Sequence, residues 1–283
     1  HDNNITVQNH SHGTDIENFY GDDAVSYDKS TFQQPVLLHV FSSGNSGASV
    51  SNTGKYKDIE GFANLTGSFK MSKNSIAVAA IDSFGNSMEY ISKGPAYDGR
   101  LKPELSACTN GGSSGAAALV SGSALLVQQY YKERFQQLPD ASMVKAILIN
   151  AADDAGPKGI DFHTGYGSLN LFKALTTVQQ GNLFSGNVPG NGTKTFSITV
   201  PANLKELKIT LAWTDPPAAA NASTALINDL DMTLTHTGGQ QWFPWVLSNF
   251  PHKDSLGLLA ARKKDHLNNT EQITIDNPPS GNY

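Results

Sequence analysis

The chain has 283 residues, with 20 lysines and arginines against 25 aspartates and glutamates and a single cysteine, Cys108. This length allows one large domain or two ordinary ones with a substantial core. The net charge of −5 argues against a nucleic-acid surface and against a polybasic membrane patch. One cysteine rules out a disulfide framework and a cysteine-based zinc site. The sequence also holds no apolar run of about 18 residues, the length needed to span a bilayer.

The N-terminal part of the sequence alternates short apolar runs with helical segments. The runs within 35–47 and 74–86 are continuous and end in glycine turns, which predicts strands buried on both faces of a parallel sheet. A long apolar helix is expected over 116–135. A second helix is expected after Asp140 or Ser142, either of which suits an N-cap. Strands mixed with helices indicate an α/β domain.

The pattern changes near residue 180, where a segment rich in glycine and asparagine reads as a linker. Beyond it apolar residues alternate with polar ones, as expected for strands with one buried face, at 196–200, 207–213, 230–234 and 273–275. This period of two is typical of a β-sandwich. We therefore expect an α/β domain over 1–180 and an all-β domain over 183–283.

A serine among small residues opens the predicted long helix, in the segment GGSSGAAALVSG at 111–122. The N-terminus of a helix offers unpaired N–H groups and the positive end of the helix dipole, which suit a developing oxyanion. Ser114 is therefore a candidate nucleophile, and an ordinary N-cap serine is the alternative interpretation.

An asparagine between glycines, Asn45 in SSGNSG at 42–47, follows a predicted parallel strand. Ligand sites in open α/β sheets lie beyond the carboxyl ends of the strands. An amide N–H held there can donate to an oxyanion. An ordinary turn is the alternative, because Gly-Asn pairs are common in turns.

Together these two motifs, 69 residues apart, resemble the nucleophile and oxyanion-asparagine segments of the subtilisin-like serine proteases. SKGPAYDGRLKPEL at 92–105 is similar to the stretch that precedes the nucleophile in that family, and NHSHGT at 9–14 is similar to its substrate-pairing strand. The resemblance covers residues 5–177. The segment 211–236 resembles the C-terminal jelly-roll domain of larger secreted subtilases.

The resemblance implies an acyl-transfer mechanism in which Ser114 attacks a peptide carbonyl and Asn45 stabilises the oxyanion. It places three further residues, Ser11, His12 and Gly13, on the strand that pairs with substrate. It also places Ser42 and Gly44 where the primary specificity pocket forms. The nucleophile motif departs from the family pattern, since Ser-Ser-Gly-Ala replaces Thr-Ser-Met-Ala, and the preceding SACTNGG loop is short.

The family carries its catalytic Asp and His before the substrate-pairing strand, and neither motif is present here. His12 opens an HGT triplet, but no long apolar helix follows it and it lies only 33 residues before Asn45. We therefore interpret His12 as a residue that lines the pocket. The sequence predicts a fragment at both ends that lacks the N-terminal part of the protease and is inactive alone, although naturally short ends are an alternative.

Asp229 and Asp231 belong to an acidic group near a predicted strand start, and carboxylates are ligands that suit Ca²⁺. We expect no cofactor in catalysis and consider these two residues as candidates for a structural calcium site, with turn chemistry as the alternative. Four aromatic residues near the end of the chain suit either a ligand platform or core packing. They are Trp242, Phe243, Trp245 and Phe250.

The sequence thus predicts a secreted or extracellular serine endopeptidase, with the periplasm or the cell surface as alternative locations. Its partners would be protein or peptide substrates and the missing part of the same protease. Two other functions stay open. One is an inactive pseudo-protease that binds partners through the β-sandwich. The other is a carbohydrate-binding protein that uses the sandwich aromatics.

Overall fold

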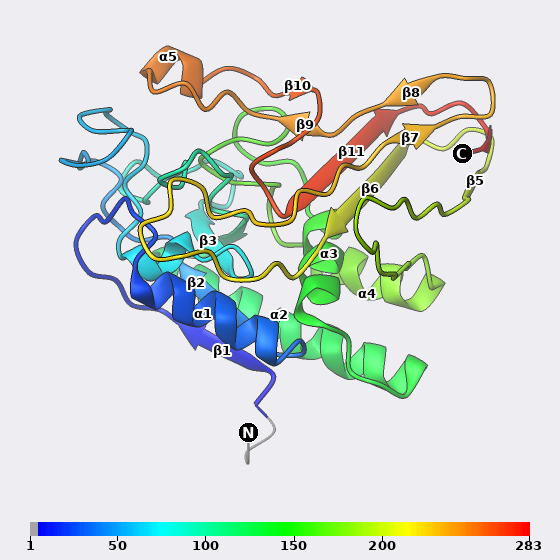
Figure 1. Cartoon of the computed structure of the whole chain (residues 1–283), viewed down its shortest axis with the longest axis horizontal. Helices are drawn as coiled ribbons and strands as arrows, with labels where there is room; N and C mark the ends of the chain where they lie inside the picture. The colour runs from blue at the N-terminus through cyan, green and yellow to red at the C-terminus, as the bar shows by residue number, and fades with distance from the viewer. Residues whose placement is uncertain (1–4) are drawn as a thin grey trace.

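The computed structural model describes residues 5–283, and its first half is built on a four-stranded parallel sheet (Figure 1). The strands are β1 (Val7–His10), β2 (Leu38–Ser42), β3 (Ile76–Ile81) and β4 (Leu105–Cys108), and they lie in that order across the sheet. β2 and β3 are buried along their whole length, because helices or loops cover both faces of the sheet. The two buried parallel strands predicted from their apolar runs are confirmed.

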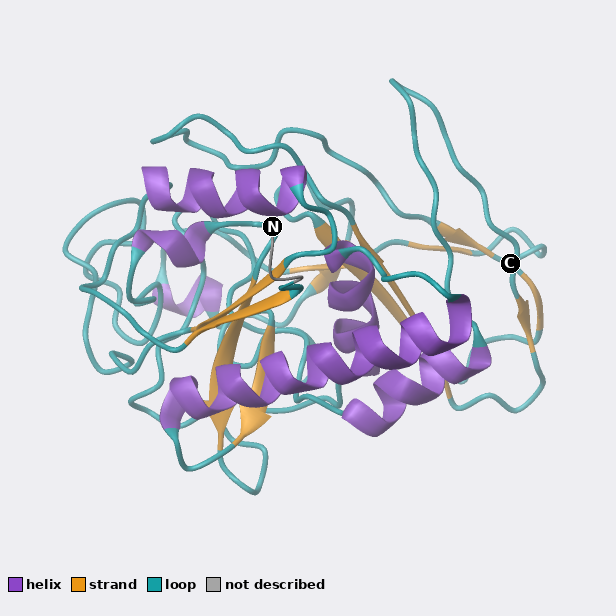
Figure 2. Ribbon diagram, turned by 90° about the horizontal axis from the view of Figure 1, so that it is seen from below, coloured by secondary structure: helices purple, strands orange, loops and turns teal. Residues whose placement is uncertain are grey.

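Helices flank this sheet on both sides (Figure 2). One face carries α1 (Asp22–Gln33) and the short 3₁₀ helix η1 (Ser68–Met71), while α2 (Gly112–Phe135) packs along the other. Next come α3 (Ala141–Ala151) and α4 (Leu171–Gln180). The expected α/β architecture and both predicted helices are therefore present. The helix α1 was not predicted.

Small side chains let α2 lie close against the sheet. Its buried face includes Ala116, Ala117, Val120 and Ala124, all with 0% exposure. Short side chains of this kind allow the helix backbone to approach the strands, and they bring the N-terminus of α2 to the carboxyl edge of the sheet. This packing fixes the position of Ser114.

The second half contains only short antiparallel pairs among the described residues, of which β6 (Glu206–Ala212) with β11 (Thr270–Asp276) is the longest. The expected jelly-roll sandwich is not seen in these pairs. The remaining elements are β5 (Thr199–Val200), β7 (Leu234–Thr235), β8 (Gln241–Trp242), β9 (Trp245–Val246), α5 (Lys253–Leu256), β10 (Ala261–Arg262) and β12 (Gly281–Asn282).

Buried polar contacts join the second half to the first. The Lys73 ammonium lies 3.3 Å from Asp28 and 3.5 Å from Asp215, and all three side chains are fully buried. Asn74 donates to the carbonyl of Asp215 at 2.8 Å and accepts from its N–H at 3.0 Å. Buried charges of this kind are costly to separate from their partners, so the two halves pack as one body.

None of the helices in residues 5–283 is both long enough and apolar enough to cross a membrane.

Candidate active site

The start of α2 meets the ends of β1 and β2 at the carboxyl edge of the parallel sheet, where α/β folds commonly place their ligand sites. Ser114 Oγ donates to the carbonyl of Ser11 at 3.2 Å. In return, Ser11 Oγ donates to the carbonyl of Ser114 at 2.9 Å. The segment that follows β1 is thus held directly against the candidate nucleophile.

A serine that the sequence analysis did not select, Ser113, connects Asn45 to the start of α2. Its N–H and its hydroxyl both donate to Asn45 Oδ1, at 3.1 and 2.9 Å. Its hydroxyl also accepts from the N–H of Gly44 at 3.1 Å. Because the oxygen end of the Asn45 amide is occupied, its Nδ2 group is left as the donor. No described residue accepts a hydrogen bond from that nitrogen.

Gly112, the first residue of α2, brings Asn45 this close. Its φ of +62° lies in the left-handed region, and a Cβ on it would meet both terminal atoms of the Asn45 amide at 3.1 Å. A side chain at this position would therefore push Asn45 away from the helix. The N–H groups of the first helical turn have no carbonyl partner within the helix, so the Asn45 amide lies beside a natural anion-binding position.

The described histidines near this site do not contact the Ser114 hydroxyl. His12 has its ring against Phe69, at 5.0 Å between ring centres. His10 and His39 face one another at 3.3 Å between ring nitrogens. Burial lowers the pKa of His39 to about 4, with a further lowering by His10. Across residues 5–283, then, no histidine is placed to take the Ser114 proton, and the rejection of His12 as that base agrees with this geometry.

The residues expected on the substrate-pairing strand lie close to those expected in the specificity pocket. Ser42 Oγ donates to the carbonyl of His12 at 3.4 Å. Gly13 and Gly44 both lie against Thr66, since a Cβ on either glycine would fall 2.3 or 2.4 Å from the Thr66 hydroxyl. The structure adds Thr66 and its neighbour Lys70 to the site. Neither residue lies in a recognisable motif, because only the fold brings them to the glycines.

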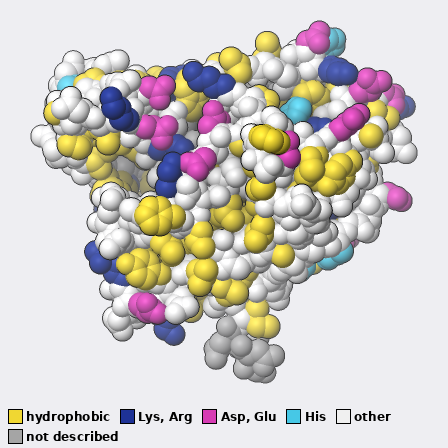
Figure 3. All heavy atoms as spheres, turned by 180° about the vertical axis from the view of Figure 1, so that it is seen from behind, with side chains coloured by type: hydrophobic (Ala, Val, Ile, Leu, Met, Phe, Trp, Pro, Cys, Tyr) yellow, Lys and Arg dark blue, Asp and Glu magenta, His cyan; other side chains and the backbone are white. Residues whose placement is uncertain are grey.

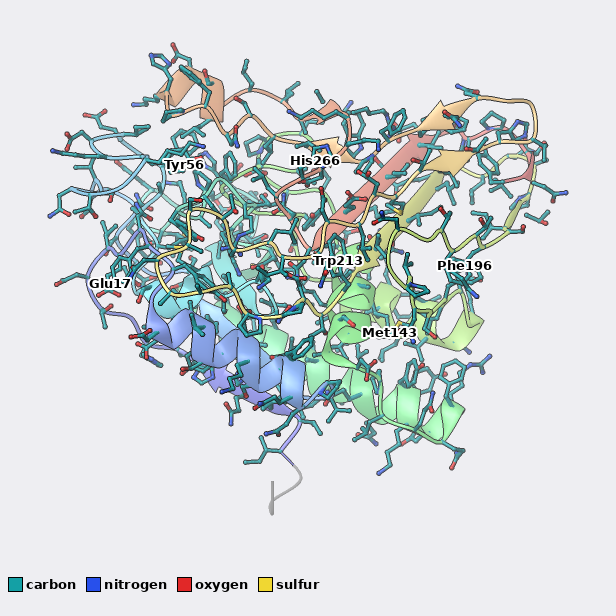
Figure 4. The ribbon with its side chains drawn as sticks, viewed as in Figure 1. Glu17, Tyr56, Met143, Phe196, Trp213 and His266 are labelled. Carbon is teal, nitrogen blue, oxygen red and sulfur yellow. The ribbon has the colours of Figure 1, made fainter. Side chains whose placement is uncertain are left out.

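The candidate calcium ligands each have a side-chain partner, a histidine for Asp229 and a lysine for Asp231. Asp229 lies 2.7 Å from His266 (labelled in Figure 4), and Asp231 lies 2.8 Å from Lys264. Asp215, from the same acidic group, is buried against Lys73. Within the described part of the chain, no three acidic, histidine or cysteine side chains are grouped so as to hold a metal ion. Calcium binding at Asp229 and Asp231 thus stays a prediction.

Comparison with known proteins gives one family. The profile of the Subtilase family (Peptidase_S8) matches residues 1–167. Among curated proteins, the serine protease/ABC transporter B family protein tagA of Dictyostelium discoideum is 30% identical over 245 residues, which cover 67% of this chain and 14% of tagA. The related protein tagD of the same organism is 22% identical and is matched over 15% of its length. The chain thus spans about one seventh of the length of these relatives.

Two peptidases are among the solved structures that match part of this chain. The patellamide maturation protease PatA is 22% identical, with a TM-score of 0.47, and the match covers 63% of this chain and 65% of PatA. Tripeptidyl peptidase 2 is 20% identical, with a TM-score of 0.44, and the match covers 72% of this chain and 16% of that protein. Since the family profile matches well over half of its residues, the chain belongs to the subtilase family of peptidases.

Proposed function

We propose that this chain supplies the nucleophile and the oxyanion hole of a secreted serine endopeptidase. The observation that supports it most is the meeting of Ser114 and Asn45 at the N-terminus of α2, with Ser113 occupying the oxygen end of the Asn45 amide. In this arrangement the Ser114 hydroxyl attacks the peptide carbonyl. The resulting oxyanion accepts hydrogen bonds from Asn45 Nδ2 and from the first turn of the helix.

Ser114 requires a base, because a serine hydroxyl is a weak nucleophile until its proton is accepted. Among the described residues its hydroxyl bonds to a carbonyl and to no histidine. The proposed base is a histidine, oriented by an aspartate, that belongs to the same protease but not to residues 5–283. No cofactor takes part in this chemistry.

The surface near Ser114 suits a contact with further protein. Leu119, Leu125 and Leu126 on α2 are 47%, 50% and 48% exposed, although they lie on the helix that begins at the site. Figure 3 shows hydrophobic side chains gathered over much of the lower part of the face seen from behind. β1 pairs only with β2 among the described strands, so its outer edge is open. The missing part of the protease is the partner that we propose for this face.

Active-site labelling tests the role of Ser114. In the longer protein that contains this chain, a fluorophosphonate probe is expected to label Ser114, because it reacts with serines activated by a base. Peptide mapping by mass spectrometry locates the label. Ser114→Ala should abolish labelling, whereas Ser142→Ala, a control in α3 away from the site, should retain it. Labelling of another serine, or none in a protein that holds the aspartate and histidine, would reject the assignment.

The second candidate function is an inactive relative that acts as a binding module. This alternative is favoured because none of the described histidines bonds to the Ser114 hydroxyl. Failure of the probe to react with the longer protein would support this alternative.

A further inference from the structure

A lysine without a counter-ion among the described residues lies beside Gly13, on the segment that contacts the candidate nucleophile. Lys70, in η1, is fully buried. Its ammonium donates to the Thr66 hydroxyl at 2.7 Å, and no described carboxylate forms an ion pair with it. A buried ammonium is normally paired, because its transfer out of water is costly. Lys70 has no such pairing among the described residues, and its ammonium lies 5.5 Å from the centre of the Phe69 ring.

The ammonium lies behind the two glycines that flank the site. A Cβ on Gly13 would fall 3.2 Å from Lys70 Nζ and 2.3 Å from Thr66 Oγ1. A Cβ on Gly44 would fall 2.4 Å from the same Thr66 hydroxyl. Thr66 thus stands between the glycines, with the ammonium directly behind it. Neither glycine has a side chain. Only backbone atoms and the Thr66 hydroxyl therefore separate the proposed substrate position from the ammonium.

These glycines adjoin the two groups that would bracket the reacting carbonyl. Gly44 precedes Asn45, the proposed oxyanion donor. Gly13 is two residues beyond Ser11, whose carbonyl accepts from Ser114 Oγ. The substrate residue that supplies the attacked carbonyl, called P1, therefore has its side chain next to Gly13 and Gly44. The Thr66 side chain is what a P1 side chain would have to displace to reach Lys70.

We propose that Lys70 is a specificity-determining residue that selects peptide substrates with an acidic P1 side chain, glutamate or aspartate. This inference rests on the proposed peptidase function. A P1 carboxylate would supply the missing counter-ion and accept hydrogen bonds from the ammonium. An amide or an apolar side chain of similar size would leave a buried ammonium unpaired, which penalises binding.

The titratable groups around Lys70 do not take the place of this carboxylate. Glu17, on the loop between β1 and α1 (labelled in Figure 4), accepts from the N–H of Ser68 at 2.6 Å. His12 and Tyr27 face the ring of Phe69, at 5.0 and 6.5 Å between ring centres. Burial lowers the pKa of Lys70 to about 7, and no neighbouring acid opposes that lowering. The free site is therefore only partly charged at neutral pH.

The test compares matched peptides in the longer, active protein. Substrates that differ only in P1 (Glu, Gln, Leu or Lys) are assayed for kcat/KM with wild type, Lys70→Met, Lys70→Glu and the surface control Lys132→Met. Wild type and the control should favour Glu over Gln by about 30-fold or more, as expected for a buried charge pair. Lys70→Met should bring this ratio close to one, and Lys70→Glu should shift the preference toward Lys.

The pH dependence gives a second readout that needs no variant. A bound carboxylate requires the charged ammonium, so kcat/KM for the Glu peptide should fall relative to the Gln peptide as the pH rises above about 7. The Gln peptide controls for ionisation of the catalytic base. If Lys70→Met fails to fold, as judged by its melting temperature, the wild-type ratio and its pH profile still decide the matter.

The outcomes distinguish a failure of the Lys70 proposal from a failure of the proposed peptidase function. If the fluorophosphonate labels Ser114 and peptides are cleaved without preference for acidic P1, the role of Lys70 is rejected and the peptidase stands. A Glu preference that survives in Lys70→Met also rejects it. If Ser114 is not labelled and no peptide is cleaved, the peptidase function fails and the inference fails with it.

Discussion

At the residue scale, the proposed chemistry depends on which end of the Asn45 amide faces the substrate. Ser113 donates twice to Oδ1, which turns Nδ2 toward the open side of the helix start. Removing that donor should raise the energy of the transition state while it leaves the substrate's other contacts in place. The proposed role therefore predicts that Asn45 acts on catalysis and contributes little to substrate binding.

Replacement of Asn45 gives a direct test of this role. Asn45→Ala in the longer protein should lower kcat by roughly 10²–10³ with little change in KM, a magnitude carried over from subtilisin itself. The control is Ser46→Ala, which alters the next residue and should leave kcat unchanged. Steady-state kinetics provide both constants. A loss of less than about threefold in kcat would show that Asn45 is not an oxyanion donor.

The sequence allowed prediction of some site residues and not others. Ser114 and Asn45 were predicted because each belongs to a short local motif with recognisable chemistry. Ser113 lies in the same motif, but its role appears only when Asn45 is brought to it. Thr66 and Lys70 stand in no motif, and they reach Gly13 and Gly44 only through the fold. Contacts between distant segments therefore had to come from the structure.

At the element scale, α2 was predicted from the sequence and α1 was not. The long helix was predicted from its continuous apolar stretch. The buried residues of α1 include Asp28 and Thr31, so its inner face carries little hydrophobic signal. Asp28 is accommodated there because Lys73, Asn74 and Tyr20 all bond to it. A helix whose buried face is polar cannot be found from hydrophobic periodicity alone.

The loop between β6 and β7 carries the residues considered for calcium. Asp229 and Asp231 face His266 and Lys264, so a bound ion would have to displace these side chains. If Ca²⁺ binds there, EDTA should lower the melting temperature, because the ion stabilises the folded state by mass action. Asp231→Asn should remove that sensitivity, while the exposed control Asp254→Asn should keep it. A melt that EDTA does not change, measured by calorimetry, would rule out the site.

At the scale of the whole molecule, the division near residue 180 was predicted from the change in hydrophobic period. In the structure the type of strand pairing differs between the two parts. The parallel sheet lies before residue 180, and the antiparallel pairs lie after it. The close packing of the two parts was not predicted, because it depends on buried polar contacts such as that of Asn74 with Asp215. Polar residues of this kind give no periodic signal in a sequence.

The central claim is that this chain carries Ser114 as the nucleophile of a peptidase whose base lies outside residues 5–283. The exposed leucines of α2 and the open edge of β1 are the surfaces that the remaining part would cover. Loss of the histidine costs a subtilisin about 10⁶ in kcat, so without that part turnover should be undetectable.

A peptide-hydrolysis assay on two purified proteins tests this claim most directly. One is residues 1–283, checked by mass spectrometry for any attached upstream segment, and the other is the longer protein, each with its Ser114→Ala variant. We predict turnover by the longer wild-type protein alone. Turnover by residues 1–283 that Ser114→Ala abolishes would contradict the account, because a histidine within this chain, with His12 as the first suspect, would then be the base.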